Sequence, residues 1–138
     1  MTDSEDDTHS SVYVDTSVFV RVMLEEPDKK AIHRDLAKFD QNVASRLLRV
    51  ELRRVGRRED ALDEADRILE GVLLIPLDED VLAAAETISP TTVGTLDAIH
   101  LATAVRLAEA GELDALMTYD KRLAAGAREH GLEVLAPS

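Results

Sequence analysis

Four carboxylates stand where this sequence could carry out chemistry, and the first of them is Asp15. Residues 11–20 (SVYVDTSVFV) alternate apolar and polar side chains and are rich in β-branched residues, which predicts a strand. Thr16 and Ser17 follow the acid and are helix N-cap types, so a helix should begin directly after the strand. Ligands of open α/β sheets bind at the carboxyl edge of the strands. By itself, Asp15 is explained equally well as a helix cap.

Glu51 lies within the apolar face of a predicted helix. Four aliphatic residues share that face at 3.6 residues per turn: Leu47, Leu48, Leu52 and Val55. A carboxylate there is costly to bury unless it is paired or binds a cation. A salt bridge to an arginine is the alternative, but four arginines line the opposite face: Arg46, Arg49, Arg53 and Arg57. A functional role for Glu51 is therefore favoured. The arginine stripe is explained as a solvated face, although it could also guide a phosphate backbone.

Asp97 and Asp120 complete the set. Residues 95–105 (TLDAIHLATAV) are small and apolar almost all round, which predicts a helix packed on several sides, with Thr95 as its N-cap. Asp97 then lies in the first turn, where the helix dipole favours it. Asp120 follows a predicted strand at 115–118, which repeats the order of strand, acid and helix seen at Asp15. His100 is expected to be a packed or hydrogen-bonded core histidine.

Each acid can be explained by itself, but four carboxylates in one place need a further explanation. Carboxylates that meet without a cation repel strongly in a medium of low dielectric. A hard divalent ion removes the repulsion, and oxygen ligands favour Mg²⁺ or Mn²⁺. The chain has no cysteine and no histidine cluster that would indicate zinc.

The elements that must position these acids alternate between strand and helix. This order predicts an α/β fold with a parallel sheet between layers of helices. The apolar run at 72–77 (VLLIPL) suggests a strand covered on both faces. With 138 residues, we expect a disordered acidic tail at residues 1–10 and one domain at residues 11–138.

The composition restricts the setting of the protein. The net charge is −12 and only four of the 16 basic residues are lysines, which suits a salt-rich cytoplasm. Taken alone, this charge argues against a nucleic-acid partner. The lack of cysteine is compatible with a reducing cytosol, and no segment is apolar enough to span a membrane. A cytoplasmic location without membrane association is expected.

The ordered set of motifs resembles the PIN-domain ribonucleases, and more narrowly the VapC toxins of type II toxin–antitoxin modules. The motifs are VDTS at 14–17, Ser45 with Glu51 and Leu52, LDAIHLATA at 96–104, and TYDKRL at 118–123. The resemblance covers residues 11–138 and implies a three-layer α/β/α domain with a five-stranded parallel sheet in the order 3-2-1-4-5. It implies that Asp15, Glu51, Asp97 and Asp120 bind the metal and are catalytic. Three hydroxyl residues would support this site: Thr16, Ser17 and Thr118.

The implied reaction is hydrolysis of an RNA phosphodiester by metal-activated water. The resemblance further implies a homodimer and a small antitoxin that presents an arginine to the acids. Two alternatives remain. A Mg²⁺-dependent phosphotransfer domain also keeps acids at strand ends, but its phosphatase form needs a second aspartate where this chain has Ser17. The other alternative is a PIN-like module that binds RNA or protein without cutting.

Overall fold

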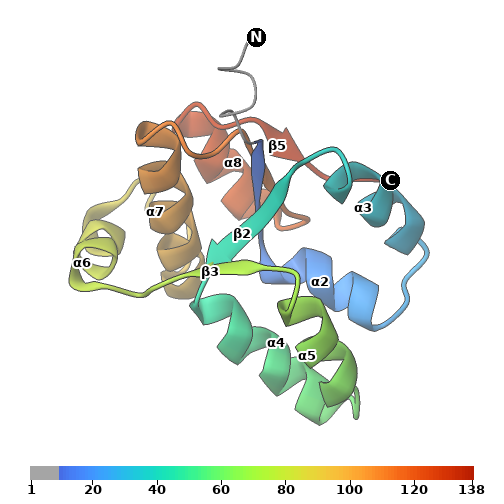
Figure 1. Ribbon diagram of the computed structural model, residues 1–138. Coiled ribbons are helices and arrows are strands. Elements are labelled where there is room, and N and C mark those ends of the chain that lie inside the picture. Colours follow the sequence, from blue (N-terminus) through green and yellow to red (C-terminus); the bar gives the residue numbers. More distant parts are fainter. Residues whose placement is uncertain (1–9) are drawn as a thin grey trace, which may run out of the picture.

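A computed structural model describes residues 10–138 of the chain as three layers, with helices on both sides of one sheet (Figure 1). The five strands are β1 (Ser11–Val14), β2 (Gln41–Ser45), β3 (Leu73–Ile75), β4 (Ala115–Met117) and β5 (Val134–Leu135). The seven helices of this part of the chain are α2 (Thr16–Met23), α3 (Lys29–Leu36), α4 (Leu47–Arg58), α5 (Leu62–Leu69), α6 (Glu79–Thr87), α7 (Thr95–Glu109) and α8 (Lys121–Glu129). Residues 1–9, most of the expected tail, lie outside the described residues.

The sheet is parallel throughout and has the strand order β3-β2-β1-β4-β5, as the resemblance implies. Strand β1 is central, and its Val12, Tyr13 and Val14 are completely buried. Helix α2 packs against α3, α4 and α5, whereas α7 packs against α6 and α8. Because β1 and β4 are neighbours, the segments that follow them lie side by side at the carboxyl edge of the sheet.

Two details of the sequence interpretation are wrong. The run at 72–77 forms only the three-residue edge strand β3, and Leu73 is 48% exposed rather than covered on both faces. An edge strand has one neighbour, so apolar composition alone cannot reveal its position in the sheet. The N-cap of α7 is Gly94 instead of Thr95, and its first turn still contains Asp97.

Helix α4 explains why Glu51 lies among apolar residues. Its Leu48 and Leu52 are completely buried in the core, and the helix packs on α2, α5 and β2. Glu51 is carried on the margin of this buried face and is itself partly exposed. No helix between residues 10 and 138 has the length and apolar character that crossing a membrane would require.

Candidate active site

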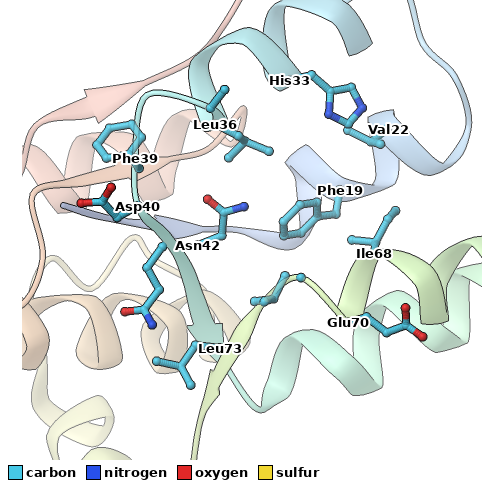
Figure 2. A pocket seen from close by; sticks show the side chains of 14 residues that line it. Phe19, Val22, His33, Leu36, Phe39, Asp40, Asn42, Ile68, Glu70 and Leu73 are labelled. Carbon is cyan, nitrogen blue, oxygen red and sulfur yellow. The ribbon is translucent and has the colours of Figure 1, made fainter. Parts of the chain in front are cut away.

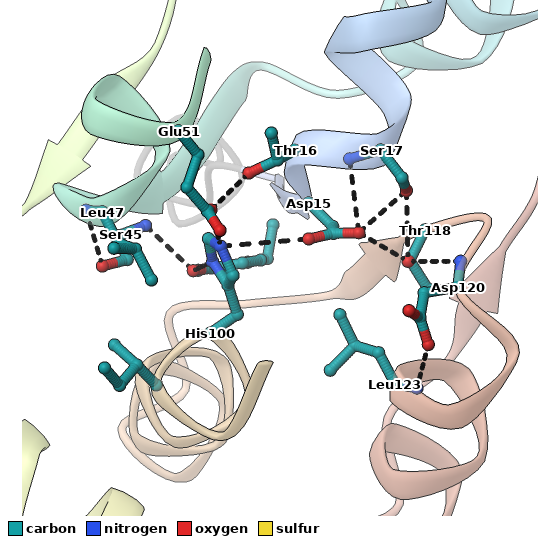
Figure 3. A network of polar contacts seen from close by, with 12 residues as sticks. Asp15, Thr16, Ser17, Ser45, Leu47, Glu51, His100, Thr118, Asp120 and Leu123 are labelled. Carbon is teal, nitrogen blue, oxygen red and sulfur yellow. Dashed lines mark hydrogen bonds and ion pairs between the residues drawn. The ribbon is translucent and has the colours of Figure 1, made fainter. Parts of the chain in front are cut away.

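Three of the four acids, Asp15, Glu51 and Asp120, lie near the ends of β1 and β4 (Figure 3). Asp15 directly follows β1, and Asp120 follows β4 after Thr118 and Tyr119. The Thr118 hydroxyl donates to Oδ2 of Asp15 at 2.9 Å and thereby joins the two strand ends. The sheet order thus brings together two acids that are far apart in the sequence.

Asp15 is 4% exposed, and its two oxygens have different surroundings. Oδ2 accepts hydrogen bonds from the hydroxyls of Ser17 at 2.8 Å and Thr118 at 2.9 Å, and it caps α2 through the Ser17 amide at 3.4 Å. Oδ1 accepts no hydrogen bond from residues 10–138, and its nearest basic atom is Nε2 of His100 at 3.9 Å. The cap interpretation is therefore correct, but it occupies only one oxygen.

Glu51 points from α4 toward Thr16 and His100 (Figure 3). Its Oε1 accepts hydrogen bonds from the Thr16 hydroxyl at 2.6 Å and from Nε2 of His100 at 2.7 Å. Burial would raise the pKa of Glu51, but these two hydrogen bonds outweigh it and hold the pKa below its ordinary value. No arginine of residues 10–138 lies within ion-pair distance of Glu51, so the salt-bridge alternative is wrong.

His100 is the functional residue that sequence reasoning placed only in the core. It is completely buried and hydrogen-bonded, as predicted, but its partners are Tyr13 and Glu51. The Ser45 amide donates to the Tyr13 hydroxyl at 2.9 Å, which leaves the hydroxyl proton to point at Nδ1 of His100 at 2.6 Å. Nε2 therefore carries the proton that binds Glu51. One feature of the sequence could have indicated a role for His100 in the site. It follows Asp97 by three residues, which puts both residues on one side of α7.

The same contacts change the pKa of the His100 side chain. Burial lowers the pKa of His100. The hydrogen bond to Glu51 and the charge of Asp15 raise it by more than burial lowers it, so the pKa lies above its ordinary value. We conclude that His100 and Thr16 together fix the orientation of the Glu51 carboxylate.

Asp97 lies in the first turn of α7, and Asp120 is the N-cap of α8. Oδ1 of Asp120 caps α8 by accepting from the Leu123 amide at 2.9 Å. Asp97 is half-buried, and burial, followed by the charges of Asp15 and Asp120, raises its pKa from 3.8 to about 6. This coupling to three other carboxylates is the electrostatic sign of convergence.

The donor set suits a hard cation. Only one oxygen each of Asp15, Glu51 and Asp120 is used by hydrogen bonds within residues 10–138, and the second oxygen of each remains available. In this part of the chain no three acidic or histidine side chains are already close enough together to hold a metal ion. Mg²⁺ keeps several waters and needs only one or two carboxylates, so the arrangement fits this ion.

Replacing Asp97 tests the cost of ionising a half-buried carboxyl beside other acids. A carboxyl whose pKa is about 6 in the folded protein and 3.8 ordinarily binds its proton more tightly when folded. Its ionisation therefore weakens folding as the pH rises through that interval. We expect Asp97→Asn to raise the Tm of the metal-free protein at about pH 7.5 and to leave it nearly unchanged at about pH 4. Equal effects at both pH values in calorimetry would contradict this explanation.

A cavity of about 650 Å³ lies elsewhere, between α3, β2 and the segment that joins α5 to β3 (Figure 2). Its walls include Phe19, Leu36, Phe39 and Ile68, and it contains none of the four acids. Its lining also includes the polar residues His33, Asp40 and Glu70, which belong to none of the motifs described above. The candidate active site is therefore the acidic cluster, and the cavity is a separate feature.

Comparisons with known proteins match most of the chain. Residues 12–129 match the PIN domain family. Ribonuclease VapC47 of Mycobacterium tuberculosis is 38% identical over 91% of this chain and 96% of its own length. Ribonuclease VapC46 of the same species is 37% identical over 94% of this chain and 99% of its own length.

Two solved structures share the fold at low sequence identity. A toxin–antitoxin complex from Klebsiella pneumoniae superposes with a TM-score of 0.71 at 19% identity and covers 92% of this chain and 98% of its own. VapBC2 from Rickettsia felis, bound to a DNA fragment from its promoter, gives a TM-score of 0.69 at 16% identity, with coverage of 93% and 99%. The three-layer fold is thus the one seen in these complexes.

Proposed function

Since this chain belongs to the PIN-domain family and is a relative of the VapC ribonucleases, we propose that it is a metal-dependent endoribonuclease and the toxin of a toxin–antitoxin pair. The observation that carries the proposal is the convergence of Asp15, Glu51, Asp97 and Asp120. Burial of Asp97 and the charges of the other three acids raise its pKa to about 6, and Asp15, Glu51 and Asp120 each keep one oxygen available for a cation. Related proteins named as ribonucleases supply the substrate class.

We propose a role for each acid. Asp15 and Asp120 would hold Mg²⁺ or Mn²⁺, while Asp97 and Glu51 would complete the ligand shell or orient water. A bound ion of this kind lowers the pKa of a water molecule and neutralises charge on the phosphoryl oxygens.

The surrounding residues prepare the acids. The hydroxyls of Ser17 and Thr118 hold Oδ2 of Asp15, so that Oδ1 stays available on the side of His100. Thr16 and His100 hold Oε1 of Glu51 in the same way. These hydrogen bonds fix the acids before substrate arrives, and such preorganisation is a large part of catalytic power.

A cleavage assay on a mixed pool of RNA tests the activity and its metal dependence. We expect cleavage in Mg²⁺, its loss in excess chelator, and its return when Mg²⁺ or Mn²⁺ is restored. Cleavage that persists in excess chelator would contradict the metal dependence. RNA binding without any cleavage would indicate a non-catalytic PIN-like module instead.

The proposed partners are an antitoxin and a second copy of the chain. The Klebsiella pneumoniae structure that shares this fold is a toxin–antitoxin complex. The Rickettsia felis structure is VapBC2. An antitoxin arginine placed among the four acids would replace the charge of the metal. Purification from the native host should recover a small protein encoded nearby, and sedimentation should give the mass of a homodimer.

A further inference from the structure

Basic charge is concentrated on one helix of this acidic protein. Residues 46–58, which include all of α4, contain six of the twelve arginines and a single acid, Glu51, and have a local net charge of +5. The whole chain has a net charge of −12. A positive patch on a negative protein strongly biases where a polyanion can approach.

Three of these arginines form a cluster that we call the arginine row: Arg54, Arg57 and Arg58. All three are exposed and together line a surface hollow of about 460 Å³. Among residues 10–138, no carboxylate lies within ion-pair distance of Arg54 or Arg57, and Arg58 has only an exposed contact of 3.4 Å to Glu59. Arg53, on the same helix, is by contrast paired with Asp66. The row therefore keeps its donors available for an anion.

The arginine row begins beside the acidic site. Arg54 and Arg58 follow Glu51 by three and seven residues, so the three side chains share one side of α4. At about 1.5 Å per residue, Arg58 lies roughly 10 Å along the helix axis from Glu51. One helix thus offers a carboxylate at the site and a line of guanidinium groups that leads away from it.

We propose that the arginine row binds the phosphate backbone of the RNA strand whose scissile bond lies at the four acids. The inference rests on the proposed ribonuclease function. Guanidinium groups bind phosphate through paired hydrogen bonds, and the row is placed to hold phosphates next to the one cleaved. It also accounts for RNA recognition by a chain whose overall charge repels polyanions.

The test compares two triple variants of equal charge in the Asp15→Asn background, where the RNA stays intact. The first is Arg54→Gln/Arg57→Gln/Arg58→Gln, and the control is Arg34→Gln/Arg106→Gln/Arg128→Gln on other helices. Binding of a labelled single-stranded RNA is measured against salt. We expect the first variant to bind about tenfold more weakly or worse, with a slope of log affinity against log salt smaller by about 2. The control should retain most of the slope of its parent.

The possible results separate this inference from the proposed function. A first variant that keeps the affinity and slope of its parent would overturn the inference, even if the protein with Asp15 intact cuts RNA. Equal losses in both variants would also overturn it, since net charge alone would then be responsible. Loss of an acidic protein partner with unchanged RNA binding would assign the row to that partner and contradict us. If the protein with Asp15 intact never cuts RNA but the first variant alone loses binding, the row stands and the nuclease proposal fails.

Discussion

Asp15→Asn is expected to lower the rate of RNA cleavage by more than about 100-fold while the fold survives. Asparagine keeps an oxygen that can accept from the Ser17 and Thr118 hydroxyls, and it is as good a helix cap as aspartate. What it removes is the negative charge beside the other three acids. Activity should therefore fall for an electrostatic reason, with little change in stability.

The matched control for this variant is Asp114→Asn. Asp114 accepts a hydrogen bond from the Ser11 amide at 2.8 Å, at the edge of the sheet opposite the four acids. The same chemical change there should leave cleavage close to that of the unaltered protein. Initial rates on one RNA substrate, together with melting curves, check both variants. An Asp15→Asn protein that cuts RNA at the unaltered rate would show that the assignment is wrong.

Tyr13→Phe, which removes a single oxygen atom, is expected to lower the free energy of unfolding by about 2–5 kcal/mol. The Tyr13 hydroxyl is completely buried and joins the Ser45 amide at 2.9 Å to Nδ1 of His100 at 2.6 Å. Its removal leaves both groups buried without a partner, and each such group costs about 1–3 kcal/mol. Urea unfolding measures the change in the free energy of unfolding.

Tyr119→Phe serves as the comparison. The Tyr119 hydroxyl donates to the carbonyl of Pro137 at 2.5 Å, but this side chain is only partly buried, so water can replace the lost bond. We expect it to cost about 1 kcal/mol. If Tyr13→Phe destabilises the protein no more than Tyr119→Phe does, the buried network contributes little to folding.

The positions of the acids could be predicted because they depend on local patterns. An acid between a strand and a helix lies at the carboxyl edge of a parallel sheet whatever the rest of the chain does, which covers Asp15 and Asp120. Glu51 is detectable because it interrupts the apolar face of a helix, and Asp97 because it lies in the first turn of a helix that is apolar almost all round. The strand order came from the resemblance to PIN domains, and the structure confirms it.

What could not be predicted depends on contacts between distant segments. The Tyr13–His100 bond joins residues 87 positions apart, and it requires the register of the sheet and the rotation of α7 to be known. The edge position of β3 likewise follows from the sheet and not from its own residues. The arginine row is different. The helical spacing of Arg54 and Arg58 from Glu51 is visible in the sequence, but the arginines on the opposite face dominate the pattern.

The bond between Asp15 and Thr118 has a consequence for protein synthesis. These two residues are 103 positions apart, and Glu51 depends on His100, 49 positions further along the chain. A ribosome that has not yet translated past β4 therefore holds a nascent chain in which Asp15 lacks the hydrogen bond from Thr118. The proposed hydrolysis should require a chain translated beyond Thr118, so shorter nascent products would spare the RNA of the cell that makes them.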